Sequence, residues 1–523
     1  MLSQKKGVYF IEEQIKKEQH CENMILFNMI SLRQTEIGAK MQKKINITKI
    51  LYFYIITFLG ILIIFCAVNL NPNNDMWWMI STGRYIVQNK TIPKINPFTI
   101  HNGYGIIVQQ WLTAIFNYEI YIHFGNIGFI TTAILMTVLS LFLCYRYISM
   151  FTNDINTKIL LISVVAFVFS SFATTRPTIF TIPVVLLELA NLEKWNGDKK
   201  NIRYLLPLIF LSVLEINIHA ALWPLLLILT LPYIAPGYAL NFKHFVTELI
   251  NRKWLIVADV LMFLSGFLSP NGVNAMLYLV KSYKKTSLMN SILELQKPAI
   301  LGVWGILLIV QIVFLVLYLR EYGANSDFSK VFLAAGTIFM SCTAVRNVWM
   351  AAIGCLPLLA DMIPNMIRFR KEHIYELWKT FIINAVLLGC IAVILSEIAG
   401  QIENKKIPAK NAAEYLASVA EPDRERVYTS FDNGGMFEWY GFKVYTDARP
   451  ELFTKEVNKK ESIDSEIYNV EYGFVDYRDF IDKYDFTYIV VNDDTPFTYY
   501  LENDTKWTDV YKSGGICIYA KFL

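Results

Sequence analysis

The sequence predicts an α-helical membrane protein that crosses the bilayer many times and ends in a small α+β domain. The chain is 54% hydrophobic and only 18% charged, whereas soluble domains average about 25% charged residues. Apolar segments of membrane-spanning length recur between residues 49 and 399, and a transmembrane helix needs about 20 such residues. From residue 405 onward Asp, Glu, Lys and Tyr are frequent, and no segment could cross a membrane.

Composition and motifs exclude several classes of protein. The net charge of +4 is too small to indicate a nucleic-acid partner. The seven cysteines are scattered without CxxC or Cys/His pairing, so the sequence indicates neither a metal site nor a disulfide framework. No Walker, GxGxxG, HExxH or GxSxG motif is present, which argues against a nucleotide-driven pump, a Rossmann enzyme, a zinc protease and an α/β-hydrolase. We therefore expect neither a cofactor nor a metal ion.

The chain divides into three predicted parts. Residues 1–45 form an N-terminal cytoplasmic extension, for which disorder and a short helix both stay open. Residues 46–404 form the transmembrane domain, with a first outer loop at 70–108, and residues 405–523 form an extracytoplasmic domain. Hydropathy predicts about eleven transmembrane helices. They lie at residues 49–69, 126–148, 159–174, 177–192, 204–218, 219–236, 255–269, 301–319, 331–345, 347–363 and 380–399.

Charge bias sets the expected topology. Residues 107–124 read as a helix lying at the interface, with an extra short span as the alternative. If they do not span, four groups of Lys and Arg all fall on one side of the membrane, which the positive-inside rule makes cytoplasmic. The N-terminus is then cytoplasmic, and the C-terminal domain lies outside. The four groups are centred on Lys43 and Lys44, Lys199 and Lys200, Arg252 and Lys253, and Arg370 and Lys371.

The C-terminal part has the pattern of a mixed domain. Residues 411–419 are amphipathic and predict a helix, and Asp432 to Gly435 give a turn signal. The cluster Asp447, Arg449 and Glu451 follows a predicted strand, and structural ion pairing is its favoured role. The predicted strands are 426–430, 443–446, 488–491 and 515–519.

The candidate catalytic residue is Asp75, which follows the first apolar segment and precedes Trp77 and Trp78. Tryptophan prefers the membrane–water interface, so the pair predicts that Asp75 lies at the outer lip of the bilayer. A carboxylate in such a partly dry setting is a candidate general base for a lipid-linked substrate. The alternative is an ordinary loop aspartate beside an interfacial anchor.

Further polar residues gather on the same predicted face. Arg176 and Arg346 each lie between two apolar segments, where an arginine can hold a phosphate or can reach toward lipid headgroups. An ionisable residue at the end of a span is costly and usually functional. The other candidate substrate- or phosphate-binding residues are Arg84, Asn217, His219, Glu294, Lys284 and Lys285.

These residues resemble a large bacterial group of membrane proteins related to the GT-C glycosyltransferases. The resemblance extends from about residue 50 to the C-terminus. The residues that carry it are Asp75-Met-Trp77-Trp78 through Gly83-Arg84, Ile92-Pro93, Asn96-Pro97-Phe98-Thr99, Gln110-Trp111-Leu112, Arg176-Pro177, Asn217-Ile-His219, Ser269-Pro270-Asn271-Gly272, Glu294-Leu-Gln296, Arg346, Gly434-Gly435, Trp439, Asp447-Ala-Arg449 and Trp507.

The resemblance implies a catalytic carboxylate in the first outer loop and a polyprenyl-phosphate-linked sugar that enters from the membrane lipids. Asp75 matches the carboxylate position. Many GT-C enzymes carry two acidic residues in this loop, whereas the neighbour here is Asn74, which argues against a bound metal. We expect transfer of a hexose or pentose to an unidentified cell-envelope acceptor on the outer face.

Each candidate residue has an expected role. Asp75 would accept the proton of the acceptor hydroxyl, and Arg176 and Arg346 would hold the leaving phosphate, with Lys284 or Lys285 as alternatives. His219 and Glu294 would orient the substrate. The competing class is a transporter, flippase or scaffold for envelope lipid-phosphates, which would need the arginines and tolerate the loss of Asp75.

Overall fold

The computed structural model describes residues 74–172, 176–198, 201–235, 242–282, 292–367, 389, 408–460 and 462–522. The predicted extension 1–45, the predicted span 49–69 and, apart from residue 389, the predicted span 380–399 lie outside the described residues. All described residues belong to one contact unit, Ile61–Leu523.

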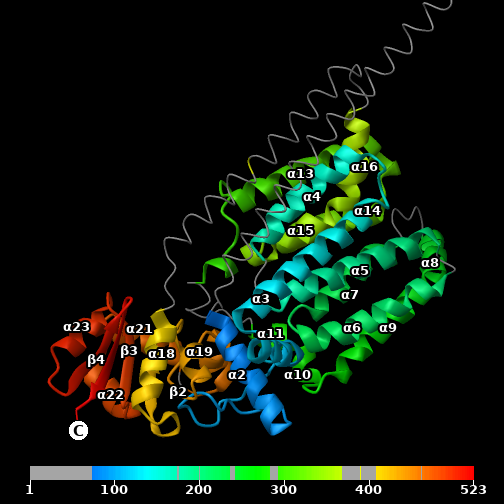
Figure 1. The fold of residues 1–523 in the computed structure, drawn as a ribbon. Coiled ribbons are helices and arrows are strands. Elements are labelled where there is room, and N and C mark those ends of the chain that lie inside the picture. The colour runs from blue at the N-terminus through cyan, green and yellow to red at the C-terminus, as the bar shows by residue number, and fades with distance from the viewer. Residues whose placement is uncertain are drawn as a thin grey trace, which may run out of the picture. The chain divides into compact units, whose positions relative to one another are not determined.

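The nine predicted spans that fall within the described ranges are helical along most of their length (Figure 1). Pro183, Pro232 and Pro364 lie inside three of these helices. Membrane helices tolerate proline because neighbouring groups satisfy the carbonyls that it frees. The helices are α3 (Trp111–Ile148), α4 (Ile155–Ser170), α5 (Thr178–Gly197), α6 (Leu206–Ile218), α7 (Trp223–Ile234), α9 (Lys253–Ser265), α13 (Val303–Tyr322), α14 (Phe328–Ser341), and the pair α15 (Val348–Gly354) and α16 (Leu356–Ile367).

Few of these helices are long enough to cross a bilayer by length and composition. In the described residues α3 and α13 meet that condition, and α15 with α16 adds a third span if the pair, bent by 48°, is counted as one. The apolar helices α4, α7 and α14 are shorter, at 10–17 residues. The count of eleven spans therefore stays a prediction.

Helix α3 contains a break at the place where the sequence separates two segments. Gly125 has φ 55° and ψ −147°, a conformation outside the helical region that glycine adopts without strain. The part before Gly125 corresponds to the predicted interfacial helix, which starts at Trp111 instead of residue 107, and the part after it corresponds to the predicted span 126–148.

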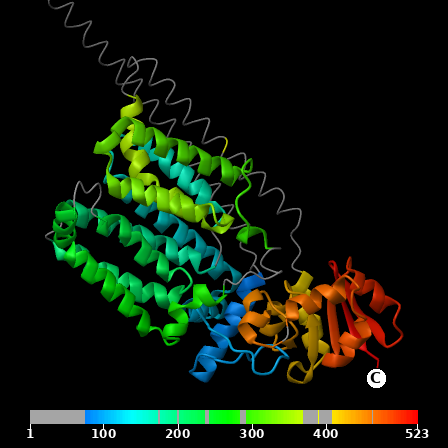
Figure 2. The same ribbon diagram turned by 180° about the vertical axis from the view of Figure 1, so that it is seen from behind.

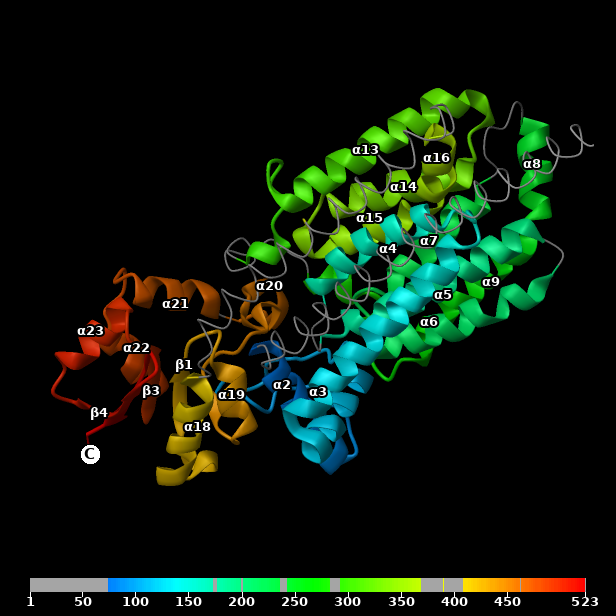
Figure 3. The same cartoon turned by 45° about the horizontal axis from the view of Figure 1, so that its top comes forward.

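The apolar helices pack in two groups that α3 joins. Helices α13 to α16 pack together and against α4, while α5, α6, α7 and α9 pack on one another, as Figure 2 shows from behind. Helix α3 contacts both α4 and α5, beside which it lies in Figure 3. Shorter helices, α8 (Phe242–Asn251), α10 (Val273–Met276) and α11 (Tyr278–Ser282), lie on either side of α9 in the sequence.

Helix α2 (Asn74–Asn89) carries Asp75 in its first turn and lies directly against α3. Gly83 permits this close approach, because a Cβ atom there would stand 2.1 Å from the carbonyl oxygen of Ala114. On its other side α2 contacts α19 (Gly434–Trp439) of the C-terminal domain. The position of Asp75 is therefore set from both sides of its helix.

The C-terminal part of the chain (residues 408–460 and 462–522), called the C-terminal domain here, contains a five-stranded sheet with the order β2-β1-β3-β5-β4. Strand β1 pairs in parallel with β2 and β3, and β5 pairs antiparallel with β3 and β4. Four strands and helix α18 confirm the sequence predictions, whereas β4 was not predicted. The elements are α18 (Pro408–Val419), β1 (Arg426–Thr429), β2 (Lys443–Val444), α20 (Lys455–Asn458), α21 (Ile463–Glu471), α22 (Tyr477–Tyr484), β3 (Tyr488–Asn492), α23 (Pro496–Glu502), β4 (Trp507–Ser513) and β5 (Ile516–Lys521).

The loop after α2 extends this sheet. Thr99 forms a parallel bridge with Val444, whose backbone N–H donates to the carbonyl of Phe98 at 3.1 Å and whose carbonyl accepts from Ile100 at 2.9 Å. Ile100 and Tyr104 belong to the same buried core as residues of β1, β3 and β5. The domain core is thus shared between the loop and the C-terminal segment.

Candidate active site

Asp75 lies in the first turn of α2, where the helix dipole favours a negative charge. The neighbouring Trp77 does not occupy a wet interface as expected. It is only 3% exposed, and its ring lies 5.5 Å from that of Tyr121 and 6.4 Å from that of Trp439. The expectation for Trp77 is therefore wrong, because α19 of the C-terminal domain covers this side of α2.

Arg176 connects two carboxylates. It precedes α5, and its Nη2 lies 2.7 Å from Asp75 Oδ2 while its Nη1 lies 2.5 Å from Glu294 Oε2. The side chains of Asp75, Arg176 and Glu294 are 25%, 33% and 40% exposed. All three line the cavity described next, so a ligand there can reach them.

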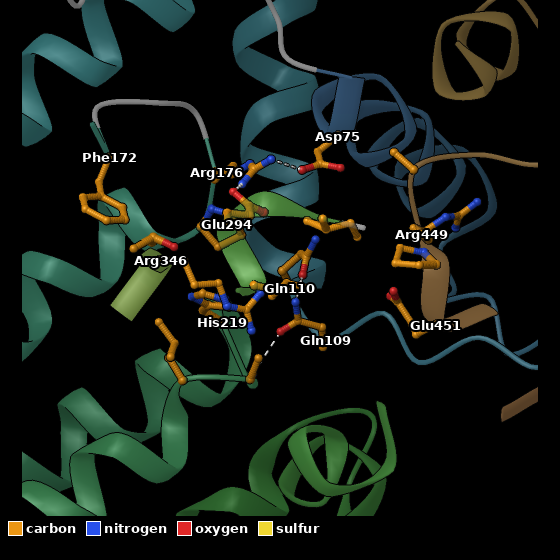
Figure 4. A pocket seen from close by; sticks show the side chains of 18 of the residues that line it. Asp75, Gln109, Gln110, Phe172, Arg176, His219, Glu294, Arg346, Arg449 and Glu451 are labelled. Carbon is orange, nitrogen blue, oxygen red and sulfur yellow. Dashed lines mark hydrogen bonds and ion pairs between the residues drawn. The ribbon is translucent and has the colours of Figure 1, made fainter. Parts of the chain in front are cut away.

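The five predicted residues Asp75, Arg176, His219, Glu294 and Arg346 line one cavity of about 1050 Å³. They come from five separate segments of the chain, and Figure 4 shows their side chains converging. The other lining residues include Trp78, Gln109, Gln110, Phe172, Tyr278, Trp304, Trp349, Phe431, Asp432, Arg449 and Glu451.

His219 caps the C-terminus of α6 and is held through its Nδ1 atom. Nδ1 lies 3.0 Å from Thr181 Oγ1, which in turn lies 2.6 Å from Glu215 Oε1. When the Thr181 hydroxyl donates to Glu215, its oxygen accepts the Nδ1–H of His219. The Nε2 atom of the neutral ring is then left as a hydrogen-bond acceptor.

Two predicted site residues do not line the cavity. Arg84 lies 4.5 Å from the centre of the Trp439 ring and donates to the carbonyls of Trp439 and Glu438 at 2.8 and 3.1 Å. Asn217 accepts a hydrogen bond from Trp111 Nε1 at 2.8 Å, because α6 stays helical to Ile218 and turns Asn217 toward α3. Lys284 and Lys285 lie outside the described residues.

The C-terminal domain, which the sequence suggested as a cap or an acceptor-binding part, supplies two cavity residues, Arg449 and Glu451, that the sequence did not assign to the site. Arg449 pairs with Asp447 at 2.5 Å and with Glu438 at 3.2 Å, and all three side chains are at most 3% exposed. This confirms the predicted structural ion pair. Arg449 also lines the cavity, as does Glu451, which accepts a hydrogen bond from Tyr278 at 2.9 Å. In Figure 4 these two side chains lie across the cavity from Arg346.

The electrostatics of the cavity favour proton transfer at Asp75. Burial raises the pKa of the Asp75 carboxyl, Arg176 opposes the rise, and the carboxylates of Glu294 and Asp432 add to it. A carboxylate with a raised pKa is a stronger base than an ordinary aspartate. Burial and the charge of Arg176 lower the pKa of Arg346 to about 10, so its guanidinium is still a cation at neutral pH.

Within the described residues, no group of three or more His, Cys, Asp or Glu side chains is arranged to hold a metal ion. In the cavity, Arg176 is paired with Asp75 and Glu294, and Arg449 is paired with Asp447 and Glu438. This arrangement can bind a phosphate through its arginines and can accept a proton at Asp75.

Comparison with known proteins gives a result at the level of structure only. No protein-family model matches the sequence, and no curated protein matches it. An oligosaccharyltransferase of Archaeoglobus fulgidus in the apo form has a TM-score of 0.56 and 11% identity, and the match covers 83% of this chain and 69% of that one. AglB from the same organism, in complex with an inhibitory peptide and a dolichol-phosphate, has a TM-score of 0.53 and 12% identity, with 84% and 69% covered.

A third similar structure comes from a different protein and a different organism. ArnT from Cupriavidus metallidurans, bound to undecaprenyl phosphate, has a TM-score of 0.53 and 11% identity over 90% of this chain and 98% of that one. In the described part of the chain, α3 and α13 are long and apolar enough to cross a membrane. The chain has the fold of the GT-C glycosyltransferases, as the resemblance in its sequence implied.

Proposed function

We propose that this chain is an integral membrane glycosyltransferase that moves a sugar from a polyprenyl-phosphate donor to a cell-envelope acceptor on the outer face. The main support for the proposal is that Asp75 lines one cavity together with two arginines, Arg176 and Arg346. Structures with the same fold contain a dolichol-phosphate or undecaprenyl phosphate, which agrees with a lipid phosphate as the ligand.

The proposed reaction is a displacement at the anomeric carbon of the donor sugar. The oxygen of an acceptor hydroxyl forms a bond to that carbon, the bond from the carbon to the phosphate oxygen breaks, and polyprenyl phosphate leaves with the electron pair. Asp75 takes the proton of the hydroxyl. Arg346 stabilises the charge that grows on the leaving phosphate, and this attraction is stronger in a cavity with little water.

The remaining cavity residues would position the two substrates. The Nε2 atom of His219 can accept a hydrogen bond from a sugar hydroxyl. Glu451 and Arg449 would contact the acceptor, because they belong to the wall opposite Arg346. The membrane topology belongs to the same proposal, with a cytoplasmic N-terminus, about eleven spans in residues 46–404 and an extracytoplasmic domain at 405–523.

The test compares the wild type with Asp75→Asn in nanodiscs that contain the polyprenyl-phosphate lipids of the host. Mass spectrometry would follow consumption of lipid-linked sugar, with cell-envelope extract as the acceptor. We expect Asp75→Asn to slow consumption by about 100-fold or more, since a general base contributes that much, while the lipid stays bound. Asp479→Asn, at an exposed position on α22, is the matched control and should keep wild-type activity.

The same experiment separates the enzyme from the competing class. Turnover by the wild type and not by Asp75→Asn supports the transferase, and the mass of the product identifies the sugar. Full activity of Asp75→Asn would remove Asp75 from the role of base. Lipid binding by both proteins, with turnover by neither, would indicate a carrier or scaffold instead.

A further inference from the structure

The guanidinium of Arg176 is held between two carboxylates. Nη2 contacts Asp75 and Nη1 contacts Glu294, at 2.7 and 2.5 Å. The Nε atom is buried and makes no hydrogen bond within the described part of the chain. One arginine therefore fixes the position of the proposed base and of a second acid on another segment.

A donor phosphate at Arg176 would meet these carboxylates as well as the guanidinium. Phosphate and carboxylate repel each other, and the repulsion is stronger in a partly dry cavity than in bulk water. An arginine that already donates to two carboxylates also has fewer N–H groups left for a bidentate contact with phosphate. Because of this repulsion, phosphate binding at Arg176 is favoured when one carboxylate leaves its N–H group.

Asp75 is the carboxylate that the surroundings favour for release. Besides Arg176 and a hydrogen bond with the Trp78 side chain, Asp75 faces two like charges, Glu294 and Asp432. Glu294 contacts the other terminal nitrogen, Nη1, so its contact with Arg176 can persist when Nη2 is vacated. Loss of the contact with Asp75 relieves repulsion in the cluster and leaves the guanidinium anchored by Glu294.

We propose that Arg176 is a latch operated by the donor, in which the donor phosphate replaces Asp75 at Nη2 and releases the Asp75 carboxylate toward the acceptor hydroxyl. Glu294 is then a positioning residue that keeps Arg176 in place during the exchange. This inference rests on the proposed function and adds an order of events to it. The donor binds first, and the base becomes available to the acceptor only afterward.

The experiment measures the chemical accessibility of individual carboxylates in the full chain. Nanodiscs are prepared with undecaprenyl phosphate, with undecaprenol, which has the same tail without the phosphate, or with neither. A water-soluble carbodiimide and glycine ethyl ester label the carboxyl groups, and peptide mass spectrometry gives the rate at Asp75 and Glu294. Asp479, exposed on α22, serves as the internal reference.

We expect undecaprenyl phosphate to raise the labelling rate of Asp75 by about tenfold, the effect of losing one charge-assisted hydrogen bond. Undecaprenol should leave the rate unchanged, and Glu294 should stay protected in all three preparations. Native mass spectrometry on the same samples shows whether the lipid is bound. Bound undecaprenyl phosphate with no change at Asp75 would overturn the latch and leave the proposed function standing. No binding of undecaprenyl phosphate would overturn both.

Two conservative variants separate a latch from a merely structural ion pair. A lysine ammonium lacks the planar fork that holds two carboxylates at once, so Arg176→Lys should show fast labelling of Asp75 already without lipid. Arg346→Lys is the matched control in the same cavity for the preparation without lipid, where it should leave Asp75 as protected as in the wild type. Protection of Asp75 in Arg176→Lys equal to that in the wild type would contradict the proposed role of Arg176.

Discussion

The guanidinium carbon of Arg84 lies 4.5 Å from the centre of the Trp439 ring, and through this contact helix α2 is fixed to the C-terminal domain. Two hydrogen bonds from Arg84 to backbone carbonyls of α19 reinforce it. A residue that the sequence suggested for substrate binding thus joins the helix that carries Asp75 to the domain that forms the opposite wall of the cavity.

Arg84→Ala should lower the free energy of unfolding by about 2 kcal/mol, the sum expected for a partly buried cation–π contact and two hydrogen bonds. The measurement is the thermal midpoint of the full chain in nanodiscs. Arg478→Ala is the matched control, because Arg478 lies 4.7 Å from the Tyr477 ring but is 58% exposed. Equal shifts in the two variants would show that the contact of Arg84 contributes no more than a surface pair.

Gly83→Ala should disturb the packing of α2 on α3. The added Cβ would stand 2.1 Å from the carbonyl oxygen of Ala114 and 2.7 Å from Cβ of Tyr118, so one of the helices must shift. We expect a loss of about 2 kcal/mol in stability and a loss of sugar transfer, since α2 carries Asp75.

The control for this variant is Gly197→Ala at the end of α5, where a Cβ atom meets nothing within 4 Å. It should change stability by less than about 0.5 kcal/mol. Thermal midpoints and transfer rates of both variants test the prediction, which would fail if Gly83→Ala were as stable and active as Gly197→Ala.

His101 should make stability depend on pH in the acid range. Burial lowers its pKa to about 4, although the Tyr445 carbonyl that accepts from Nε2 at 2.7 Å and the Glu466 carboxylate oppose the shift. Between pH 6.5 and 4 the unfolded chain binds a proton that the folded chain does not. The contribution of His101 to the free energy of unfolding is therefore fully present above pH 6.5. It decreases by about 3 kcal/mol as the pH falls to 4.

The comparison variant is His101→Gln, whose side-chain amide can still donate to Tyr445 and does not titrate. Unfolding midpoints measured from pH 4 to pH 7 should have a smaller slope in His101→Gln than in the wild type. The same slope in both proteins would assign the acid sensitivity to other groups.

Three residues of the candidate site could be predicted from the local sequence alone. Arg176, His219 and Arg346 interrupt apolar segments, and a polar residue at such a position is costly unless it has a partner or a ligand. The argument depends only on local sequence. The same local argument predicted the apolar helices of the described part of the chain, but not α2, which lies in the predicted first outer loop.

The failures concern partners that lie far away in the sequence. Arg84 is separated from Trp439 by 355 positions, and no local pattern indicates that pairing. Asn217 was placed on the wrong side because its direction depends on where α6 ends. Arg449 was correctly read as an ion-pair residue, but its second position, on the wall of the cavity, depends on how the C-terminal domain contacts α2.

Strand β4 was missed for a different reason. Its seven residues do not alternate between buried and exposed, since only Trp507 is buried, and its pairing with β5 is irregular between Asp509 and Tyr511. A strand of this kind lacks the period of two that sequence analysis uses. Strand β4 is recognised from its hydrogen bonds to β5.

The bridge between Thr99 and Val444 also has a consequence for how the protein is made. The ribosome completes the first of these residues 345 positions before the second, and at usual speeds of synthesis that interval lasts roughly 20 to 70 seconds. During this time Ile100 and Tyr104 have no core to enter, so the nascent loop exposes apolar side chains. A chaperone that shields this loop until β2 has been synthesised would cover these apolar side chains during that interval.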